Sequence, residues 1–394
     1  MFQSLRTVRL RTGEPVSAAV IRGPDDEWAE RIERMLLHKG DPWNWQNSEL
    51  LRRNCGVGAN FFVLHREGVP FANIMIIETG GVALLGHVWT APADRGAGGS
   101  SLLMELAMNE FRARGGRAVF LGTEFDSIAW RYYRRRGFEL VEPGSGYMAF
   151  YYQARTRGRR MDRDDCRGGE GDDCGGGGND CRGGSDDDCR GGGGSEFERD
   201  WFGASEGVIE PLDWPHWAAA APLCLGDFGD VVRLAGVQLI GRRSSEEPLL
   251  RLLRDERGDG AARELPKTVV LRDANGPAVL GLASRQRHPL WPKTEILDVF
   301  CHPRWWHRAP AMIAALGSQT RGGLASPGRS ETTAPIQIAS DDSCRTIAYM
   351  DEGQREKRAI LEQAGLRETA VLNKWVPRTA AAGERMNVSV FTSD

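Results

Sequence analysis

The stretch from residue 82 to residue 103 constrains the fold of this chain more than any other. Residues 82–90 form an apolar run typical of a strand, and the residues that follow position 98 have the spacing of an amphipathic helix. Between them lies the glycine-rich turn 95–101, which reads RGAGGSS. A strand, a tight glycine turn and a helix in this order direct backbone N–H groups and a helix N-terminus at one point, which attracts a phosphate. The stretch therefore predicts an α/β fold with a site for a phosphorylated ligand.

A second motif follows at residues 129–138, which read AWRYYRRRGF. Together the two motifs resemble the GNAT superfamily of N-acetyltransferases. In that family a Q/R-x-x-G-x-G/A turn binds acetyl-CoA, and an A-x-x-L-Y-x-x-x-G-F helix carries a general-acid tyrosine. Arg95, Gly98 and Ser100 occupy the three defining positions of the turn, with Ser100 in place of the usual glycine or alanine. The resemblance extends over essentially the whole first domain and implies acetyl-CoA-dependent N-acetyl transfer.

The glycine turn and the resemblance together indicate which residues hold acetyl-CoA. Backbone N–H groups of the turn are expected to bind the pyrophosphate, because glycine permits a close approach and the helix dipole attracts anions. The resemblance implies that the pantetheine arm pairs with the end of the preceding strand, and that Asp126 stands where the family usually has asparagine. The expected cofactor-binding residues are Val88, Trp89, Thr90, Arg95, Gly96, Ala97, Gly98, Gly99, Ser100, Ser101 and Asp126.

Tyr133 is the predicted general acid. A phenol has a pKa near 10, so it is protonated at neutral pH and can give a proton to the departing thiolate. Tyr132 is the competitor, and the family spacing selects Tyr133 because Gly137 follows it by four residues. The alternative is that both tyrosines belong to the apolar core.

The general base and the acceptor side are predicted from polar and aromatic residues near the expected cleft. Glu124 follows a short strand and is the preferred base, with Asp126 and His87 as the other candidates. Trp43, Trp45 and His87 are expected to line the acceptor site, where indoles can hold an apolar or cationic substrate. The alternatives are a packed loop anchor for the two indoles and a core histidine for His87. No metal site is expected.

The chain is divided by a low-complexity segment at residues 156–195, composed largely of Asp, Cys, Arg and Gly. Because it contains almost nothing apolar to bury, it is predicted to be a disordered linker. A metal-binding tract is the alternative, but the cysteines are seven or eight residues apart, whereas closed zinc sites usually contain ligand pairs about 2–4 residues apart. The expected domains are therefore 1–155 and 196–378, with a frayed tail at 379–394.

The second domain is similar to a degenerate GNAT domain. Trp305 and Trp306 stand where the glycine turn would be, so we expect no acetyl-CoA to bind there. The fold class is thus α/β with mixed α+β sheets, in two GNAT-like domains. The elements expected in the second domain are a hairpin at 268–282, a strand at 295–300, a helix at 309–316 and a last strand at 372–376.

The composition is that of an ordinary globular protein and excludes some classes of partner. The 394 residues carry a net charge of −3 and are 41% hydrophobic, so neither a nucleic-acid partner nor a membrane is expected. The N-terminus lacks an apolar signal-peptide region, and a cytoplasmic location is expected. The resemblance implies transfer of an acetyl group to a primary amine by direct attack. The acceptor is left open between a small-molecule and a peptide amine, and the oligomeric state between a monomer and a homodimer. The alternatives are a non-catalytic acetyl-CoA sensor and a scaffold or interaction protein.

Overall fold

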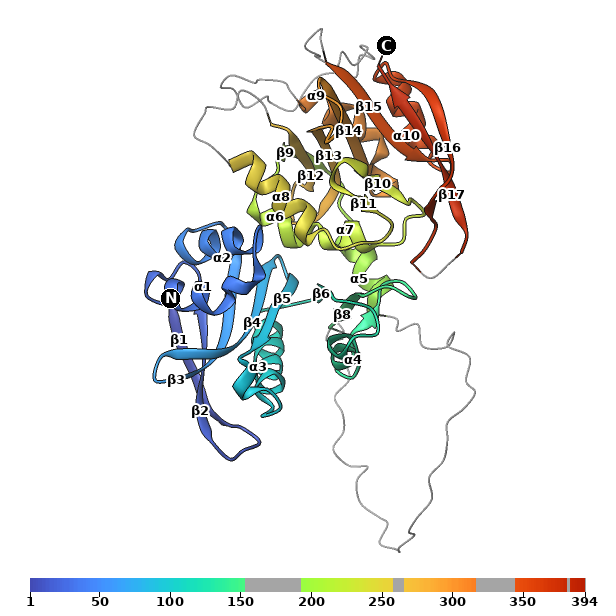
Figure 1. Ribbon diagram of the computed structural model, residues 1–394. Coiled ribbons are helices and arrows are strands. Elements are labelled where there is room, and N and C mark those ends of the chain that lie inside the picture. The colour runs from blue at the N-terminus through green and yellow to red at the C-terminus, as the bar shows by residue number, and fades with distance from the viewer. Residues whose placement is uncertain (153–192, 258–265, 317–343, 381–382, 394) are drawn as a thin grey trace, which may run out of the picture.

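The chain forms two mixed α/β units, each built around a mixed sheet (Figure 1). This arrangement, seen in a computed structural model, confirms the predicted fold class. The predicted linker 156–195 lies outside the described residues, except that residues 193–195 begin helix α5. Within the described ranges, no helix is both long enough and apolar enough to cross a membrane. The residues that the structure describes are 1–152, 193–257, 266–316, 344–380 and 383–393.

The first unit contains an eight-stranded sheet in the order β1-β2-β3-β4-β5-β6-β8-β7. Helices α1 and α2 pack on one face of this sheet, and α3 and α4 pack on the other. The elements are β1 (Phe2–Arg9), β2 (Pro15–Arg22), α1 (Asp26–Leu36), the 3-10 turn η1 (Leu37–Lys39), α2 (Trp43–Arg52), β3 (Gly58–Arg66), β4 (Val69–Thr79), β5 (Val82–Thr90), η2 (Pro92–Asp94), α3 (Gly99–Ala113), β6 (Ala118–Gly122), α4 (Ile128–Arg134), β7 (Glu139–Leu140) and β8 (Tyr147–Tyr151).

The start of α1 shows how local sequence sets these boundaries. The Asp25 carboxylate accepts the backbone N–H of Trp28 at 3.1 Å and caps the helix. Trp28, Ile32 and Leu36 recur every four residues and are buried against the sheet. The predicted helix therefore forms where its apolar stripe and its cap agree.

The second unit contains a seven-stranded sheet whose order, β9-β12-β13-β14-β15-β17-β16, repeats the order from β2 to β7 of the first sheet. Strands β14 and β15 run parallel, as do β5 and β6 at the corresponding position. The elements are α5 (Gly193–Trp201), β9 (Gly207–Pro211), α6 (Trp214–Ala219), α7 (Ala221–Leu225), β10 (Val232–Leu234), η3 (Ala235–Val237), β11 (Leu239–Ile240), α8 (Glu246–Arg257), β12 (Thr268–Asp273), β13 (Val279–Arg287), β14 (Thr294–Cys301), η4 (Pro303–Arg308), α9 (Ala309–Ala315), β15 (Arg345–Asp351), α10 (Arg355–Gln363), β16 (Arg367–Pro377) and β17 (Arg385–Thr392).

The end of the chain differs from the prediction of a frayed tail at 379–394. Residues 385–392 form β17, which pairs with β15 on one side and with β16 on the other. Val388 and Phe391 are buried there. The tail prediction was wrong because pairing on both edges and burial of apolar side chains hold this segment, despite its position near the end of the chain.

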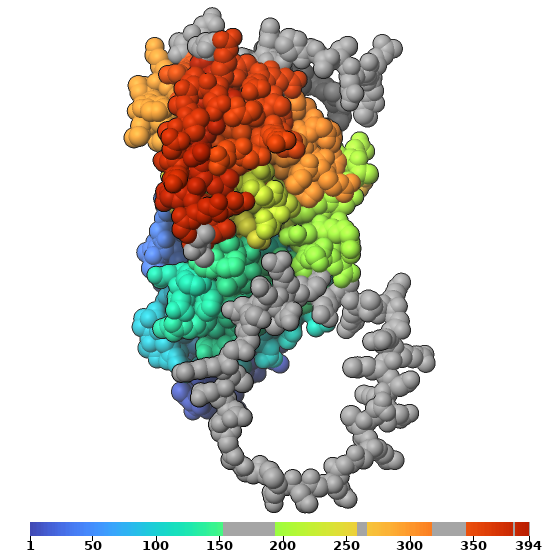
Figure 2. Space-filling model, turned by 90° about the vertical axis from the view of Figure 1, so that its right-hand side faces the viewer, coloured from blue at the N-terminus to red at the C-terminus, as the bar shows by residue number. Residues whose placement is uncertain are grey.

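The two units share one continuous apolar core, and their surfaces lie directly against each other (Figure 2). Helix α6 lies against β4 and β5 of the first sheet, and its Trp214, which is fully buried, stacks on Trp45 of α2 with ring centres 5.4 Å apart. Phe197 of α5 packs against Phe120 and Tyr151 at the other end of that sheet. These contacts place α6 and α8 of the second unit beside the first sheet (Figure 1).

Candidate active site

Strands β5 and β6 separate shortly after they begin. They pair through residues 82–84 and diverge beyond that point. His87 has a positive φ of 50° opposite a register shift between Asn73 and Met75, and the Asn73 side-chain amide donates to the His87 carbonyl at 2.9 Å. The bulge turns β5 away from β6, so that the half-buried residues 88–90 line the opening between the strands.

The glycine turn closes one end of this opening. Gly96 and Gly98 have φ values of 82° and 85°, which other residues adopt only with strain. Helix α3 begins at Gly99, and the N–H groups of Gly99 and Ser100 precede its first hydrogen bond, which the Ser101 N–H donates to the Gly98 carbonyl at 3.0 Å. A Cβ on Gly98 would lie 3.3 Å from two side-chain atoms of Arg11. The turn is therefore a narrow cradle of backbone N–H groups of the kind that binds a phosphate.

Two arginines add positive charge near this cradle. Arg95 folds back so that its Nε donates to the Thr90 carbonyl at 3.2 Å. Arg11, which the sequence did not reveal, lies in the β1–β2 hairpin, and its backbone N–H donates to the Ala97 carbonyl at 3.0 Å. No local pattern marks Arg11, because the hairpin reaches the turn only once the sheet has formed.

The end of helix α4 explains the spacing of the second sequence motif. Gly137 has a φ of 84°, and the Phe138 N–H donates to the Tyr133 carbonyl at 3.2 Å. This is the Schellman closure of a helix, which requires glycine at its left-handed position. It also brings the rings of Phe138 and Tyr133 to 5.7 Å. The spacing of tyrosine, glycine and phenylalanine thus fixes the position of the Tyr133 side chain.

The two adjacent tyrosines have different environments. The Tyr132 hydroxyl donates to the Ser100 carbonyl in the first turn of α3 at 3.0 Å, and the Arg136 guanidinium lies 3.6 Å from the centre of its ring. Tyr133 is only 6% exposed, and its pKa is raised by burial first and then by negative charge on Tyr132 and Glu246. Tyr133 is therefore a protonated phenol at neutral pH.

The two predicted acidic residues lie on the surface. Asp126 is exposed, and both oxygens of its carboxylate accept from Arg131 at 3.0 and 3.1 Å, which lowers its pKa. Glu124 is also exposed. Asp126 thus pairs with Arg131, and neither carboxylate lines the cavity between the units.

His87, Trp43 and Trp45 have separate roles. His87 is buried, its Nε2 is 2.8 Å from the Gln46 amide oxygen, and burial lowers its pKa to about 3. The imidazole is therefore neutral and a poor proton acceptor. Trp43 packs edge-on against His87 at 5.6 Å and lines the cavity, whereas Trp45 stacks on α6. Trp45 is thus a packed anchor, the alternative interpretation, but both indoles lie in helix α2 and not in a loop.

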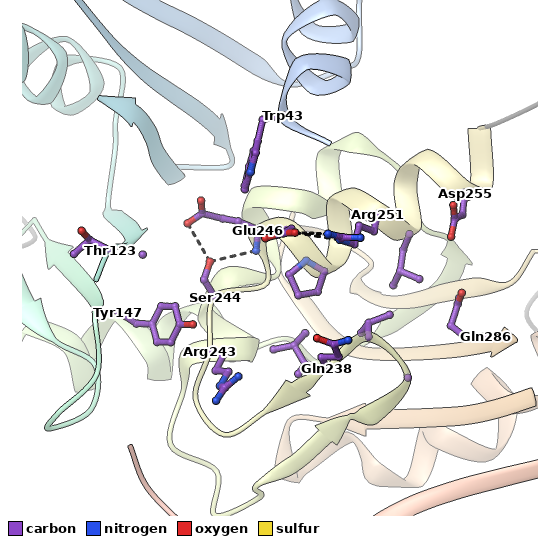
Figure 3. A pocket seen from close by; sticks show the side chains of 17 residues that line it. Trp43, Thr123, Tyr147, Gln238, Arg243, Ser244, Glu246, Arg251, Asp255 and Gln286 are labelled. Atoms are coloured by element: carbon purple, nitrogen blue, oxygen red, sulfur yellow. Dashed lines mark hydrogen bonds and ion pairs between the residues drawn. The ribbon is translucent and has the colours of Figure 1, made fainter. Parts of the chain in front are cut away.

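A cavity of about 670 Å³ lies between the two units (Figure 3). The first unit contributes Trp43, Thr123 and Tyr147, and the second contributes Ser244 and Glu246. Across the described residues, no group of three His, Cys, Asp or Glu side chains is placed to hold a metal ion. The volume is within the range of small-molecule sites, about 300–1,000 Å³.

The corresponding opening in the second unit is filled by the chain itself. Strands β14 and β15 pair as far as Ile296 and Ile347 and then diverge. Asp298 and Asp351 lie in the diverging parts, where they accept backbone N–H groups of residues 231–236 at 2.6 to 2.9 Å. The segment 231–236 therefore occupies the space between the two strands.

Other buried residues hold this segment in place and fill the space that follows β14. The Lys357 ammonium, fully buried, donates to the carbonyls of Val232 and Arg233 at 2.9 and 3.2 Å. Trp305 and Trp306 are buried where the glycine turn would be, and helix α9 has proline in its first turn, which removes one N–H donor.

Residues 24–138 match the family described as "Acetyltransferase (GNAT) family". This segment is a GNAT acetyltransferase domain. The match ends at Phe138, so it includes the bulge, the glycine turn and the tyrosine helix of this GNAT domain. No curated protein matches the chain.

Several solved structures resemble the chain over about a third of its length. An acetyltransferase of the GNAT family from Staphylococcus aureus is 15% identical, with 34% of this chain and 98% of that chain covered and a TM-score of 0.30. A GNAT family acetyltransferase from Brucella melitensis in complex with acetyl-CoA is 18% identical, with 35% and 89% covered and a TM-score of 0.28. The PaiA N-acetyltransferase from Thermoplasma acidophilum in complex with coenzyme A is 14% identical, with 34% and 99% covered and a TM-score of 0.27.

Proposed function

We propose that the first unit is an acetyl-CoA-dependent N-acetyltransferase that transfers an acetyl group to a primary amine by direct attack. The observation that supports this most is the cradle at the start of α3, which follows the end of β5 that no longer pairs with β6. The match of residues 24–138 to the acetyltransferase family supports acyl transfer in general.

The residues of the cradle fit the pyrophosphate of acetyl-CoA. Gly96 and Gly98 adopt positive φ values, and a side chain at position 98 would fill the space toward Arg11. Residues 96–101 would hold the pyrophosphate, with positive charge from Arg11 and Arg95. Residues 88–90 would pair with the pantetheine arm. Bound acetyl-CoA supplies the acetyl group as a thioester that an amine can attack.

Tyr133 is the proposed proton donor. It is buried near the opening between β5 and β6, and its raised pKa keeps the proton in place until a strong base forms. A thiolate leaving from the thioester is such a base. Tyr132, by contrast, is engaged with the Ser100 carbonyl, which suits a role in fixing the first turn of α3.

The second unit is proposed to be a GNAT-like domain that does not bind acetyl-CoA. Its strand order supports this relationship, because it repeats that of the first unit from β2 onward. The segment 231–236 between β14 and β15 supports the loss of binding, as do the buried Trp305 and Trp306. Its proposed role is to shape the acceptor side of the first unit.

Replacing Gly98 with tryptophan is expected to weaken acetyl-CoA binding at least about tenfold, which corresponds to about 1.4 kcal/mol. The indole would fill the cradle beside Arg11. Gly115→Trp is the matched control, because Gly115 follows the same helix with a φ of 89° and a Cβ added there would meet nothing within 4 Å. Both variants carry similar backbone strain, so a difference between them reports on the cradle.

Calorimetric titration of acetyl-CoA into the full chain measures this. About one site per chain, lost in Gly98→Trp and kept in Gly115→Trp, supports the proposal. Two sites per chain would contradict the view that the second unit is blocked. Absence of binding to the unsubstituted protein would refute acetyl-CoA-dependent catalysis, and binding without turnover of any amine would favour a sensor.

A further inference from the structure

Glu246 reaches from the second unit toward the reaction site of the first. It is the first residue of α8, and its side chain extends below Trp43 in the direction of Thr123 (Figure 3). The Ser244 hydroxyl donates to its carboxylate at 3.0 Å and accepts its backbone N–H at 3.2 Å. The Trp217 indole of α6 donates to the Glu246 carbonyl at 2.9 Å. These bonds fix the start of α8 and the direction of the carboxylate.

The cavity around Glu246 is also lined by residues of the first unit that lie next to the opening between β5 and β6. Thr123 directly follows β6, and Trp43 contacts His87 at the bulge of β5. These are the two strands that diverge to form the opening. The negative charge of Glu246 contributes to the raised pKa of both Tyr133 and Tyr147. The carboxylate and the predicted general acid therefore lie within electrostatic range of each other, across the boundary between the units.

None of the contacts described for the Glu246 side chain is with a cationic group. The other charged residues that line the cavity are engaged elsewhere or exposed. Glu247 pairs with Arg251 at 2.6 Å. Arg243 lies beside Tyr147, whereas Asp255 lies at the other end of the cavity (Figure 3), and both side chains are exposed. A cationic group that enters the cavity would thus meet Glu246 in the part that Trp43 and Tyr147 also line.

We propose that Glu246 binds the ammonium group of the acceptor and takes its proton, so that the second unit supplies the general base for the first. The inference rests on the proposed N-acetyltransferase function and names its acceptor class, a small-molecule primary amine with an apolar or aromatic body. Trp43 and Tyr147 would contact that body, since aromatic faces attract both apolar groups and cations.

The acid–base properties of Glu246 suit this role. Burial raises its pKa to about 7, although the hydrogen bond from Ser244 opposes the shift. A general base is most effective when its pKa is near the working pH. Glu124, the base expected from the sequence, is exposed and lies outside the cavity lining.

The proton balance of the transfer is complete with two side chains. Glu246 accepts one proton from the ammonium, which leaves a neutral nitrogen. That nitrogen forms a bond to the acetyl carbonyl carbon as the C–S bond breaks, and the electron pair of the broken bond goes to sulfur. Tyr133 gives its proton to the sulfur and regains one from the nitrogen. Glu246 then releases its proton to water, so the net products are the amide, the free thiol and one proton.

The raised pKa of Glu246 also predicts a pH dependence of stability that does not require turnover. In the folded state the carboxyl holds its proton up to about pH 7, whereas its ordinary pKa is 4.5. Stability is therefore expected to fall as the pH rises from 4.5 to 7, because the unfolded state releases the proton first. Glutamine has no proton to release, so Glu246→Gln should not lose stability in this way. The melting temperature of the variant, relative to that of the unsubstituted protein, should therefore rise between about pH 5 and pH 8. An equal pH dependence in both proteins would show that Glu246 has an ordinary pKa and would overturn the role of base.

Turnover by Glu246→Gln tests the proposal directly. Release of free thiol from acetyl-CoA would be measured with a panel of tyramine, phenethylamine, spermidine and glucosamine. We expect kcat/KM for the best amine to fall about 10²-fold, with acetyl-CoA affinity unchanged, and the acidic limb of the pH profile near 7 to disappear. Glu362→Gln, an exposed residue of α10, is the control for the same substitution elsewhere in the second unit. Glu124→Gln tests the alternative base.

The outcomes separate this inference from the proposed function. Full turnover by Glu246→Gln with an intact acidic limb would overturn the inference and leave the acetyltransferase in place. Loss of turnover in Glu124→Gln alone would assign the base to Glu124. An unsubstituted protein that binds acetyl-CoA but acetylates none of the amines would refute the proposed activity, and the inference with it.

Discussion

Replacing Tyr133 with phenylalanine is expected to lower kcat by about 10²- to 10⁴-fold, the usual contribution of a positioned general acid. The substitution removes only the hydroxyl, and the ring would keep its contacts with Phe138 and Tyr132. The affinity for acetyl-CoA should stay the same, because the cradle at the start of α3 is untouched. Steady-state thiol release together with calorimetry would separate the two effects.

Two further substitutions of tyrosine by phenylalanine make this result specific. Tyr152 donates to the Met108 carbonyl at 2.8 Å on the far part of α3, so Tyr152→Phe loses a comparable hydrogen bond away from the site and should keep its kcat. Tyr132→Phe tests the competitor. A large loss in Tyr132→Phe with normal turnover by Tyr133→Phe would reverse the assignment. Normal turnover by both variants would mean that water protonates the leaving group.

The GNAT domain could be predicted from sequence because its signals are local. The apolar run 82–90, the glycine turn and the helix after it are neighbours in the chain, and glycine is required where φ is positive at Gly96 and Gly98. The pattern of Tyr133, Gly137 and Phe138 is likewise contained in one helix end. In the second unit the hairpin expected at 268–282 is confirmed by the antiparallel pairing of β12 and β13.

The parts that sequence could not reveal depend on contacts between distant segments. Arg11 reaches the glycine turn through the β1–β2 hairpin, far earlier in the chain. Glu246 is the first residue of α8, and the sequence Ser-Ser-Glu-Glu at this point is ordinary for the start of a helix. Its carboxylate comes to lie near the first unit because α6, which contacts α8, packs against the first sheet. Sequence reasoning therefore points to a base near β6, at Glu124, within the same domain as the acid.

The second unit has a similar strand order, but the space between its diverging strands is occupied by the chain itself. Its sheet opens between β14 and β15, as the first sheet opens between β5 and β6, yet the segment 231–236 fills the opening. The sequence predicted the loss of the cradle from Trp305 and Trp306. It did not predict the filled opening, because Asp298 and Asp351 lie far from the segment that they bind. The stability of this unit should then depend on the buried charges that hold the segment.

Replacing Lys357 with methionine is expected to destabilise the second unit by about 3–5 kcal/mol, the usual loss when one partner of a buried charge network is removed. The ammonium is fully buried, and its removal leaves the carbonyls of Val232 and Arg233 without their donor. It also removes the positive charge that favours ionised Asp298. Burial lowers the pKa of Lys357 while the nearby aspartates oppose that shift, so the network depends on each member.

Denaturant unfolding of the full chain, followed by hydrogen exchange of the amides in β10, measures this loss and locates it. Lys267→Met is the matched control, because Lys267 is exposed and the same change there should alter stability by less than about 1 kcal/mol. Fast exchange in β10 of Lys357→Met, with slow exchange kept in β4 and β5, would show that the charges hold the segment between β14 and β15. Unchanged stability and slow exchange in β10 would instead mean that apolar packing alone keeps the segment between β14 and β15, and that Lys357 is not needed to hold it there.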